Sequence, residues 1–398
     1  MKKANSMPTI SKKTAMRFVL LLGFVSLFAD ITYEGARSIS GPYLASLGAN
    51  ATIVGFVAGF GEMLGYILRL FSGYFVDRTS RHWLIIFVGY AINLLAVPLL
   101  AIVGHWQLAA LLLFLERSGK AFRTPARDVM LSVASEPIGS GWGFGIHKAM
   151  DQAGGMIGPL IIAGVLYFQG SYQEGFALLL FPALLTLLIL FIAQRVFPSP
   201  QLLAENPTQI EQKKLPTTFW LYLTSASLIA AGYADFPLIA YHFEQASILP
   251  KTWIPISYAL ALGVSGISAL VFGYLYDRLG FLVLVIITLF SSLFAPCCFL
   301  GGFYLALLGM ILWGIGMGIQ ASLMRAIVAN MISFKKRGIA YGIFNTVYGI
   351  SWFLGSFLMG YLYDTSIILL VVFSVTIQLL AIPILIVVYT NNIRASRT

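Results

Sequence analysis

The sequence predicts an all-α membrane protein with twelve transmembrane helices in two pseudo-symmetric six-helix bundles. Hydrophobic residues make up 59% of the chain and charged residues only 10%, whereas a soluble domain carries roughly 25% charged residues. The apolar runs are roughly 20 residues or longer, which is the length that a helix needs to cross about 30 Å of hydrocarbon. They do not alternate in the manner of a membrane β-barrel, so helices are expected throughout.

The apolar runs divide the chain into two halves of six spans. The first run follows a basic leader and is too long for a signal-peptide core, so it is expected to remain as the first helix. Residues 198–218 are rich in Pro, Gln and charge, which is typical of a solvated linker. The predicted spans are 17–40, 50–75, 82–104, 106–133, 142–168, 174–197, 219–241, 253–276, 281–300, 302–332, 337–362 and 366–390. The predicted units are a tail (1–16), an N-terminal bundle (17–197), the linker (198–218), a C-terminal bundle (219–390) and a second tail (391–398).

Short motifs recur between the two halves. The segment from Gly73 to Arg78 returns from Gly273 to Arg278 with the same glycine, aspartate and arginine spacing. Gly158 recurs in step as Gly355. A duplicated six-span unit is a construction found in secondary transporters, which place their site near the bilayer midplane between the repeats.

The net charge of +10 is distributed as in a membrane protein. Most lysines and arginines of the connecting segments fall on one side of the predicted spans, and only Lys251 falls on the other. This asymmetry predicts that both termini are cytoplasmic. We therefore expect a multi-pass protein of a bacterial inner membrane that contacts the lipid bilayer and binds no nucleic acid.

A stripe of charges lies inside the fourth predicted span. Glu116, Lys120, Arg123 and Arg127 step by four, three and four residues, which places them on one helix face. Charges within a bilayer cost several kcal/mol unless they face one another or a wet cavity. The stripe therefore predicts a polar pathway through the membrane.

Acidic residues inside the spans are candidates for carrying a coupling proton, because a desolvated carboxylate exchanges protons near neutrality. In the first span Asp30, Glu34 and Arg37 share one face, so a structural ion pair with Arg37 is the alternative for either carboxylate. The proton-coupling candidates are Asp30, Glu34, Glu62, Glu116, Asp151 and Asp235.

Basic and polar residues of the spans are candidates for lining a substrate cavity. They can bind an anionic group or compensate the buried carboxylates, and for His147 a hydrogen-bonded structural role is the alternative. The cavity candidates are Arg37, Arg117, Lys120, Arg123, His147, Lys148, Arg325 and Asn345. The second half carries fewer charges, so we expect it to supply mainly apolar contact, with polar groups from Tyr233, Tyr241, Tyr258, Gln320 and Tyr348.

Several function classes find no support in the sequence. No phosphate-binding glycine loop leads into a lysine and a serine or threonine, so ATP-driven transport is not expected. No cluster has metal-ligand spacing and no nucleophile–base set stands out, so neither a cofactor nor an enzyme is expected. The two cysteines, Cys297 and Cys298, are adjacent in an apolar run and are expected to be core residues.

The duplicated turn carries a resemblance to a known family. With its glycine, aspartate and arginines, the chain resembles the major facilitator superfamily across nearly its whole length. The resemblance implies alternating access between two bundles, with Asp77 helping to hold the outward-open state. The second copy lacks a counterpart of Arg81. The candidates for this conformational latch are Gly73, Asp77, Arg78, Arg81, Arg127, Asp128, Gly273, Asp277 and Arg278.

The fifth span contains a second family pattern. Gly154, Gly158 and Pro159 resemble a glycine–proline motif of exporters, and glycines four residues apart let helices approach closely. In the fourth span, Lys120 and Ala121 stand where the exporter pattern has glutamine and glycine. We expect a monomeric transporter that exchanges protons for a small solute in the direction of efflux. The alternatives are an uncoupled facilitator, an importer of a small organic anion, or a non-transporting receptor or assembly protein.

Overall fold

The computed structural model describes residues 12–79, 81–198, 215–280, 282–332 and 337–397. These residues form helices and connecting turns, and none of them forms a β-strand. The side chains of Asp77, Arg78, Asp277 and Arg325 lie outside this description, as do most of the predicted linker and parts of both predicted tails. The domain boundaries therefore stay predictions.

Twelve membrane crossings account for the helices, as predicted. The first half contains α1 (Lys12–Ser46), α2 (Ala51–Arg78), α3 (His82–Leu99) with η1 (Leu100–Ile102), α4 (Trp106–Ser135), η2 (Glu136–Ile138), α5 (Ser140–Tyr167), α6 (Tyr172–Leu178) and α7 (Leu180–Val196). The second half contains α8 (Thr217–Gly232), α9 (Phe236–Gln245), α10 (Trp253–Leu279), α11 (Leu282–Ser292), α12 (Phe294–Leu300), α13 (Phe303–Met331), α14 (Arg337–Thr365) and α15 (Ile367–Arg397).

Three crossings consist of two helices each, namely α6 with α7, α8 with α9, and α11 with α12. Among the described residues, eleven crossings are apolar enough to span a membrane by length and composition. The twelfth is α4, which carries the predicted charge stripe. The predicted span 219–241 is not one continuous helix, because the chain leaves the helical conformation from Tyr233 to Asp235.

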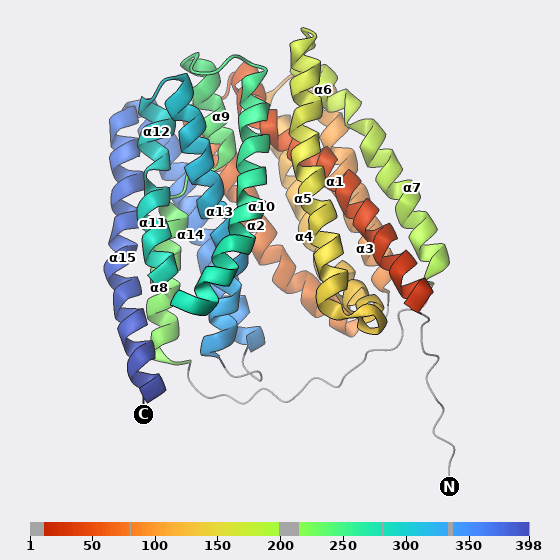
Figure 1. The fold of residues 1–398 in the computed structure, drawn as a ribbon. Helices are drawn as coiled ribbons and strands as arrows, with labels where there is room; N and C mark the ends of the chain where they lie inside the picture. The colour runs from red at the N-terminus through yellow and green to blue at the C-terminus, as the bar shows by residue number, and fades with distance from the viewer. Residues whose placement is uncertain (1–11, 80, 199–214, 281, 333–336, 398) are drawn as a thin grey trace.

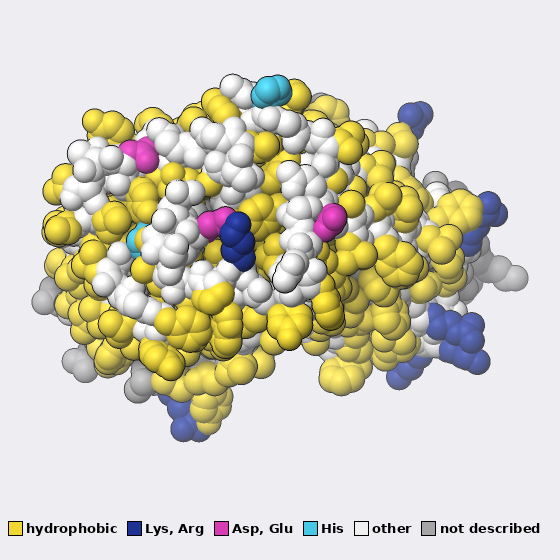
Figure 2. Space-filling view, turned by 90° about the horizontal axis from the view of Figure 1, so that it is seen from above, with side chains coloured by type: hydrophobic (Ala, Val, Ile, Leu, Met, Phe, Trp, Pro, Cys, Tyr) yellow, Lys and Arg dark blue, Asp and Glu magenta, His cyan; other side chains and the backbone are white. Residues whose placement is uncertain are grey.

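The two bundles stand side by side, and α1 begins on the same side of the molecule as α15 ends (Figure 1). We call this the terminal side and the other the distal side. Seen from the distal side, the surface is mainly hydrophobic or uncharged polar, with few charged side chains (Figure 2). Which side faces the cytoplasm stays a prediction.

Glycines allow the first helix of each half to approach a partner helix at backbone distance. A Cβ on Gly154 or Gly158 of α5 would lie 2.2 or 2.4 Å from a carbonyl oxygen of α1. In the second half, a Cβ on Gly355 of α14 would lie 2.0 Å from the carbonyl oxygen of Ala231 in α8. Gly158 and Gly355, which recur in step in the sequence, thus occupy equivalent contacts in the two halves.

The halves meet on the distal side. The Asp364 carboxylate at the end of α14 accepts hydrogen bonds from the backbone N–H groups of Ala51 (3.2 Å) and Thr52 (2.9 Å), where it also complements the dipole of α2. Tyr172 of α6 donates to Glu244 of α9. Gly41 of α1 faces the carbonyl oxygen of Pro237 so closely that a Cβ would lie 1.9 Å away.

The halves part toward the terminal side. Helices α5 and α10 touch near mid-length, where Gln152 lies against Leu262 and Gly266. Beyond that point the two helices diverge (Figure 1), and a Cβ on Gly145 or Gly273 would meet no atom within 4 Å. The structure is therefore closed on the distal side and parted on the terminal side.

The glycine contacts give a testable prediction. Gly158→Ala should lower the apparent melting temperature in detergent, because the added methyl group forces α1 and α5 apart at a cost of about 1–3 kcal/mol. Gly164→Ala is the matched control on the same helix, since a Cβ there meets nothing within 4 Å. The control should be neutral or slightly stabilising. Equal melting temperatures for the two variants would contradict the close contact.

Candidate functional site

An ion network joins the two halves in the interior of the membrane. The Arg37 guanidinium of α1 lies 3.0 Å from Glu62 of α2 and 2.6 Å from Asp235, which precedes α9. The side chains of Arg37 and Asp235 are only 10% and 1% exposed. Because α1 and α9 belong to different halves, this arginine ties the halves together.

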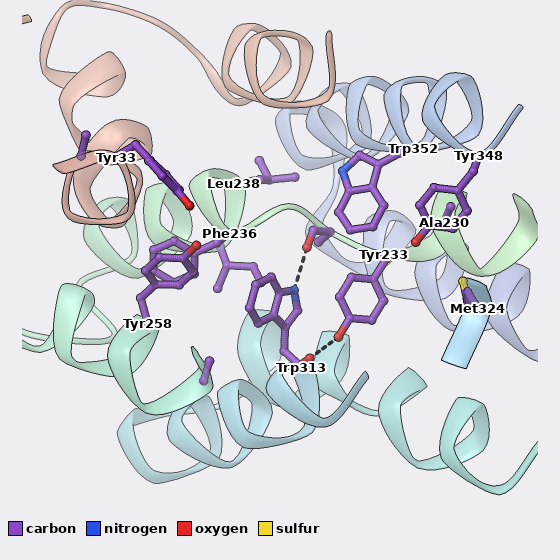
Figure 3. Packing of buried hydrophobic residues seen from close by; sticks show 14 of the residues in the cluster. Tyr33, Ala230, Tyr233, Phe236, Leu238, Tyr258, Trp313, Met324, Tyr348 and Trp352 are labelled. Carbon is purple, nitrogen blue, oxygen red and sulfur yellow. Dashed lines mark hydrogen bonds between the residues drawn. The ribbon is translucent and has the colours of Figure 1, made fainter. Parts of the chain in front are cut away.

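The position of Asp235 depends on the break between α8 and α9. The carbonyl oxygen of Gly232, freed by the break, accepts hydrogen bonds from Ser374 (2.6 Å) and Gln378 (3.1 Å) of α15. Trp313 Nε1 donates to the Ala234 carbonyl oxygen at 2.9 Å, and Tyr233 donates to the Trp313 carbonyl oxygen (Figure 3). A broken helix is tolerated in a membrane only where its backbone groups find such partners.

Asp235 is the first residue before α9, and its side chain does not cap the helix. Its carboxylate is held instead by Arg37 and by Trp352 Nε1 at 3.4 Å. The break therefore turns a carboxylate of the second half toward the first half. Discontinuous helices whose ends face the midplane are a recurring feature of transporter sites.

Two further residues of α4 extend the network. Arg117 lies 3.4 Å from Glu62 and 3.3 Å from Glu116. Glu116 also accepts a hydrogen bond from Asn93 at 2.9 Å. We call Arg37, Glu62, Glu116, Arg117 and Asp235 the central ion network. Each of its charges contacts an opposite charge, which lowers the cost of burying it.

A second polar cluster lies beside it between α1, α4 and α10. Lys120 Nζ lies 3.8 Å from Glu34 and 3.5 Å from the ring centroid of Tyr33. Tyr258 of α10 donates to Glu34 at 2.6 Å. Glu34, for which an ion pair with Arg37 was one alternative, is therefore paired with Lys120, while Arg37 contacts Glu62 and Asp235.

Two carboxyl groups meet between α1 and α5. Asp30 and Asp151 lie close enough to act electrostatically on each other. Tyr33 donates to Asp30, while Ser26 (3.0 Å) and Lys148 donate to Asp151. Ionised carboxylates only accept hydrogen bonds. Two adjacent carboxylates repel each other when both are ionised, so the binding of one proton between them is favoured.

Two cavities flank Arg37. The distal cavity lies between Arg37 and the distal side, and its empty space of about 460 Å³ includes space open to solvent. The proximal cavity lies between Arg37 and the terminal side, and its empty space of about 680 Å³ likewise includes space open to solvent. The distal cavity is lined by Tyr33, Ala36, Arg37, Ser40, Leu44, Val57, Ala58, Gly61, Leu113, Glu116, Arg117, Asp235 and Pro237. The proximal cavity is lined by Arg37, Glu62, Tyr66, Met317, Gln320, Met324, Phe344, Asn345, Tyr348 and Trp352.

Some candidates lie away from both of these cavities. Arg123, 1% exposed, packs its guanidinium 3.9 Å from the Tyr90 ring centroid and 3.5 Å from Asn93, inside the first bundle. His147 is 5% exposed and buried. Neither these residues nor Lys120 and Lys148 are among the residues that line the two cavities. The charge stripe of α4 is thus divided among the central ion network, the cluster around Glu34 and the interior of the first bundle.

The latch residues are described only in part. Arg127 pairs with its neighbour Asp128 at 2.8 Å, and Arg278 lies over the Tyr274 ring at 4.5 Å. Arg81 precedes α3 and makes no side-chain cap hydrogen bond there. A latch through Asp77, Arg78 and Asp277 lies outside the described side chains, and its role stays a prediction, as does the cavity role of Arg325.

Sequence reasoning did not single out Tyr66, Phe344, Trp313 and Trp352. A signal was available for α14, where Phe344, Tyr348 and Trp352 follow one another at intervals of four residues on one helix face. Aromatic residues are so frequent in this chain, at 14%, that spacing alone did not separate this face from lipid-facing rings.

The fold and this paired-charge interior define a polytopic membrane transport protein. The chain matches the Major Facilitator Superfamily over residues 20–356 and again over residues 236–395. It therefore belongs to this superfamily.

Relatives extend over nearly the whole chain. An uncharacterized protein from Mycobacterium tuberculosis is 39% identical over 93% of this chain and 92% of its own length. An uncharacterized MFS-type transporter from Methanocaldococcus jannaschii is 28% identical over 87% of this chain and 89% of its own length.

Solved transporters share the fold at low identity. A peptide transporter of the POT type in complex with sulfate superposes with a TM-score of 0.77 at 14% identity, covering 98% of this chain and 99% of its own. The nucleoside transporter NupG gives 0.71 at 13% identity, covering 96% and 100%. An inward-facing, occupied bacterial homolog of the human lysosomal transporter Spinster gives 0.72 at 16% identity, covering 98% of both chains.

The ion pair between the halves gives a second prediction. Arg37→Gln should destabilise the protein by about 3–5 kcal/mol, because it leaves the buried Asp235 without its cation and Glu62 with Arg117 alone. Adding Asp235→Asn should recover part of the loss, as a double-mutant cycle of melting temperatures would measure.

Lys251→Gln serves as the control, because Lys251 pairs with Glu244 at 3.2 Å while its own side chain is 67% exposed. Its effect should stay within about 1 kcal/mol. Strictly additive losses for Arg37→Gln and Asp235→Asn would show that the two side chains do not interact.

Proposed function

We propose that this protein exchanges protons for a small solute by alternating access, in the direction of efflux. Membership of the Major Facilitator Superfamily supports secondary transport as such. Proton coupling rests on one observation, the adjacent carboxyls of buried Asp30 and partly exposed Asp151 between α1 and α5.

The other buried carboxylates have fixed cationic partners. Glu62 contacts two arginines, and Asp235 contacts Arg37. Glu116 contacts Arg117, and Glu34 contacts Lys120. In each of these contacts the cation compensates the charge of the buried carboxylate. Asp151 contacts Lys148, whereas no ion pair of the described residues includes Asp30, which leaves Asp30 beside Asp151 as the favoured proton site.

The charged surroundings of the pair suggest a route for proton exchange. Lys120 and Arg127 of α4 and Lys148 of α5 act electrostatically on the two carboxyls, as does Glu34 of α1. The Lys148 side chain is 64% exposed and contacts Asp151. Asp151 therefore lies next to solvent on the parted, terminal side, while Asp30 is 5% exposed.

Helix α1 offers a physical link between the proton site and the junction of the halves. It carries Asp30 at the pair and Arg37 at the inter-half ion network, about two helical turns apart. A change of charge at Asp30 therefore acts on the same helix that carries Arg37. Arg37 in turn contacts Asp235 of the other half. Efflux is favoured by the glycine–proline pattern of α5, whose glycines contact α1 at this same site.

The test is flux from proteoliposomes loaded with a bacterial metabolite extract, followed by mass spectrometry. The wild-type protein should release at least one solute only when an inward-directed proton gradient is imposed, and a protonophore should abolish the release. Asp30→Asn and Asp151→Asn should each lower gradient-driven release by about 100-fold, because neither variant retains the carboxyl pair that binds the proton.

Glu136→Gln is the control, since this carboxylate is exposed in η2, and it should leave flux unchanged. Release that persists with the protonophore would support an uncoupled facilitator instead. Uptake of an organic anion that is lost in Arg37→Gln but not in Asp30→Asn would support the importer alternative.

A further inference from the structure

We infer that the proximal cavity binds an uncharged aromatic molecule that carries a hydrogen-bonding group. The inference rests on the proposed function only in taking this cavity as part of the transport path. Binding itself needs neither a proton gradient nor a membrane, so it can be tested separately from coupling.

The first observation is a ladder of rings on α14. The rings of Phe344 and Tyr348 are stacked, with centroids 5.7 Å apart and planes 17° apart. Tyr348 and Trp352 follow at 5.9 Å and 43°. From α2 of the other half, Tyr66 meets Tyr348 edge-on at 5.5 Å. All four residues line the proximal cavity, so a planar ligand finds aromatic side chains from both halves.

The second observation is the set of polar groups beside the ladder. Gln320 accepts the Tyr348 hydroxyl at its Oε1, so its amide N–H groups stay available to donate. Within the described part of the chain, the Asn345 side chain makes no hydrogen bond, although it lines the cavity. Both ion pairs of Glu62 use Oε1, which leaves Oε2 to accept a hydrogen bond. These groups suit an amide, hydroxyl or ring N–H.

The third observation is the balance of charge. The charged residues that line the proximal cavity are Arg37 and Glu62, and they contact each other at 3.0 Å. Arg37 is also held by Asp235. An anionic ligand would find no unpaired cation on this wall, and a cationic one would lie next to Arg37. A charge buried without a partner is costly, so the cavity favours an uncharged ligand.

Ring stacking and hydrogen bonding make separate contributions to affinity. An aromatic contact is worth roughly two- to tenfold in Kd beyond the apolar area that it buries. A buried polar group left without a partner costs roughly tenfold or more. A ligand must therefore offer both a flat ring and a polar group to use this wall fully.

The test compares four probes of one size on the purified protein in detergent. These are 2-naphthamide (uncharged), 2-naphthoate (anion), 2-naphthyltrimethylammonium (cation) and the saturated decahydro-2-naphthamide. We expect 2-naphthamide to raise the apparent melting temperature and to bind at least tenfold more tightly than the two ions by calorimetry. The saturated amide should bind roughly tenfold more weakly than 2-naphthamide.

Variants locate the site. Phe344→Leu should weaken 2-naphthamide at least fivefold, and Asn345→Leu should weaken it while leaving the ranking of the ring compounds unchanged. Tyr361→Leu is the matched control, because Tyr361 lies on the same helix with a 56% exposed side chain, and it should leave Kd unchanged.

Tightest binding of either ion, no binding of any probe, or equal effects of Phe344→Leu and Tyr361→Leu would overturn the inference. Binding as expected together with the absence of gradient-dependent flux would overturn the proposed coupling and leave the cavity assignment standing. Proton-coupled flux of an anionic solute would support the proposed coupling and overturn the cavity assignment.

Discussion

The junction of the two halves depends on Arg37. In the low-dielectric interior, its contact with Asp235 is much stronger than an exposed ion pair, and breaking it leaves uncompensated charge. The guanidinium can serve two carboxylates because it offers five N–H donors in a planar fork, and it uses one end for both Glu62 and Asp235. Arg37 also lines both cavities and lies between them. The contact between the halves and the separation of the two cavities therefore depend on the same side chain.

This constraint places demands on the second half. Asp235 can reach Arg37 because the helix stops after Gly232 and starts again at Phe236. The break would be costly in a membrane, but side chains of α13 and α15 satisfy the carbonyl oxygens of Gly232 and Ala234. The buried tryptophans and the polar residues of α15 therefore act on the site indirectly, by holding the backbone that presents one carboxylate.

The sequence was sufficient for the fold, and only in part for the site. The length of the apolar runs predicted the twelve crossings, and the recurrence of Gly158 as Gly355 predicted two related halves. Both features can be recognised along the chain without knowing which helices touch. Spacing also predicted which charges share a helix face. It could not tell which neighbouring helix that face meets: Glu34 pairs with Lys120 rather than Arg37, and Arg123 lies against Tyr90. The break at Tyr233 to Asp235 was missed although an Asp–Phe–Pro sequence can start a helix.

The arrangement separates two tasks that share one helix. Glu62 and Asp235 contact Arg37 and hold the halves in register, whereas in the proposed exchange the proton is taken up and released at Asp30, beside Asp151. If the same carboxylates did both, every protonation would also remove the contact between the halves on which the cavity boundary depends. In the proposed exchange, a proton bound two turns from Arg37 on α1 acts on that helix while the ion network stays intact. Under the proposed assignment, the solute contacts aromatic rings and amides of the proximal cavity, and these contacts do not compete for the charges that hold the halves together.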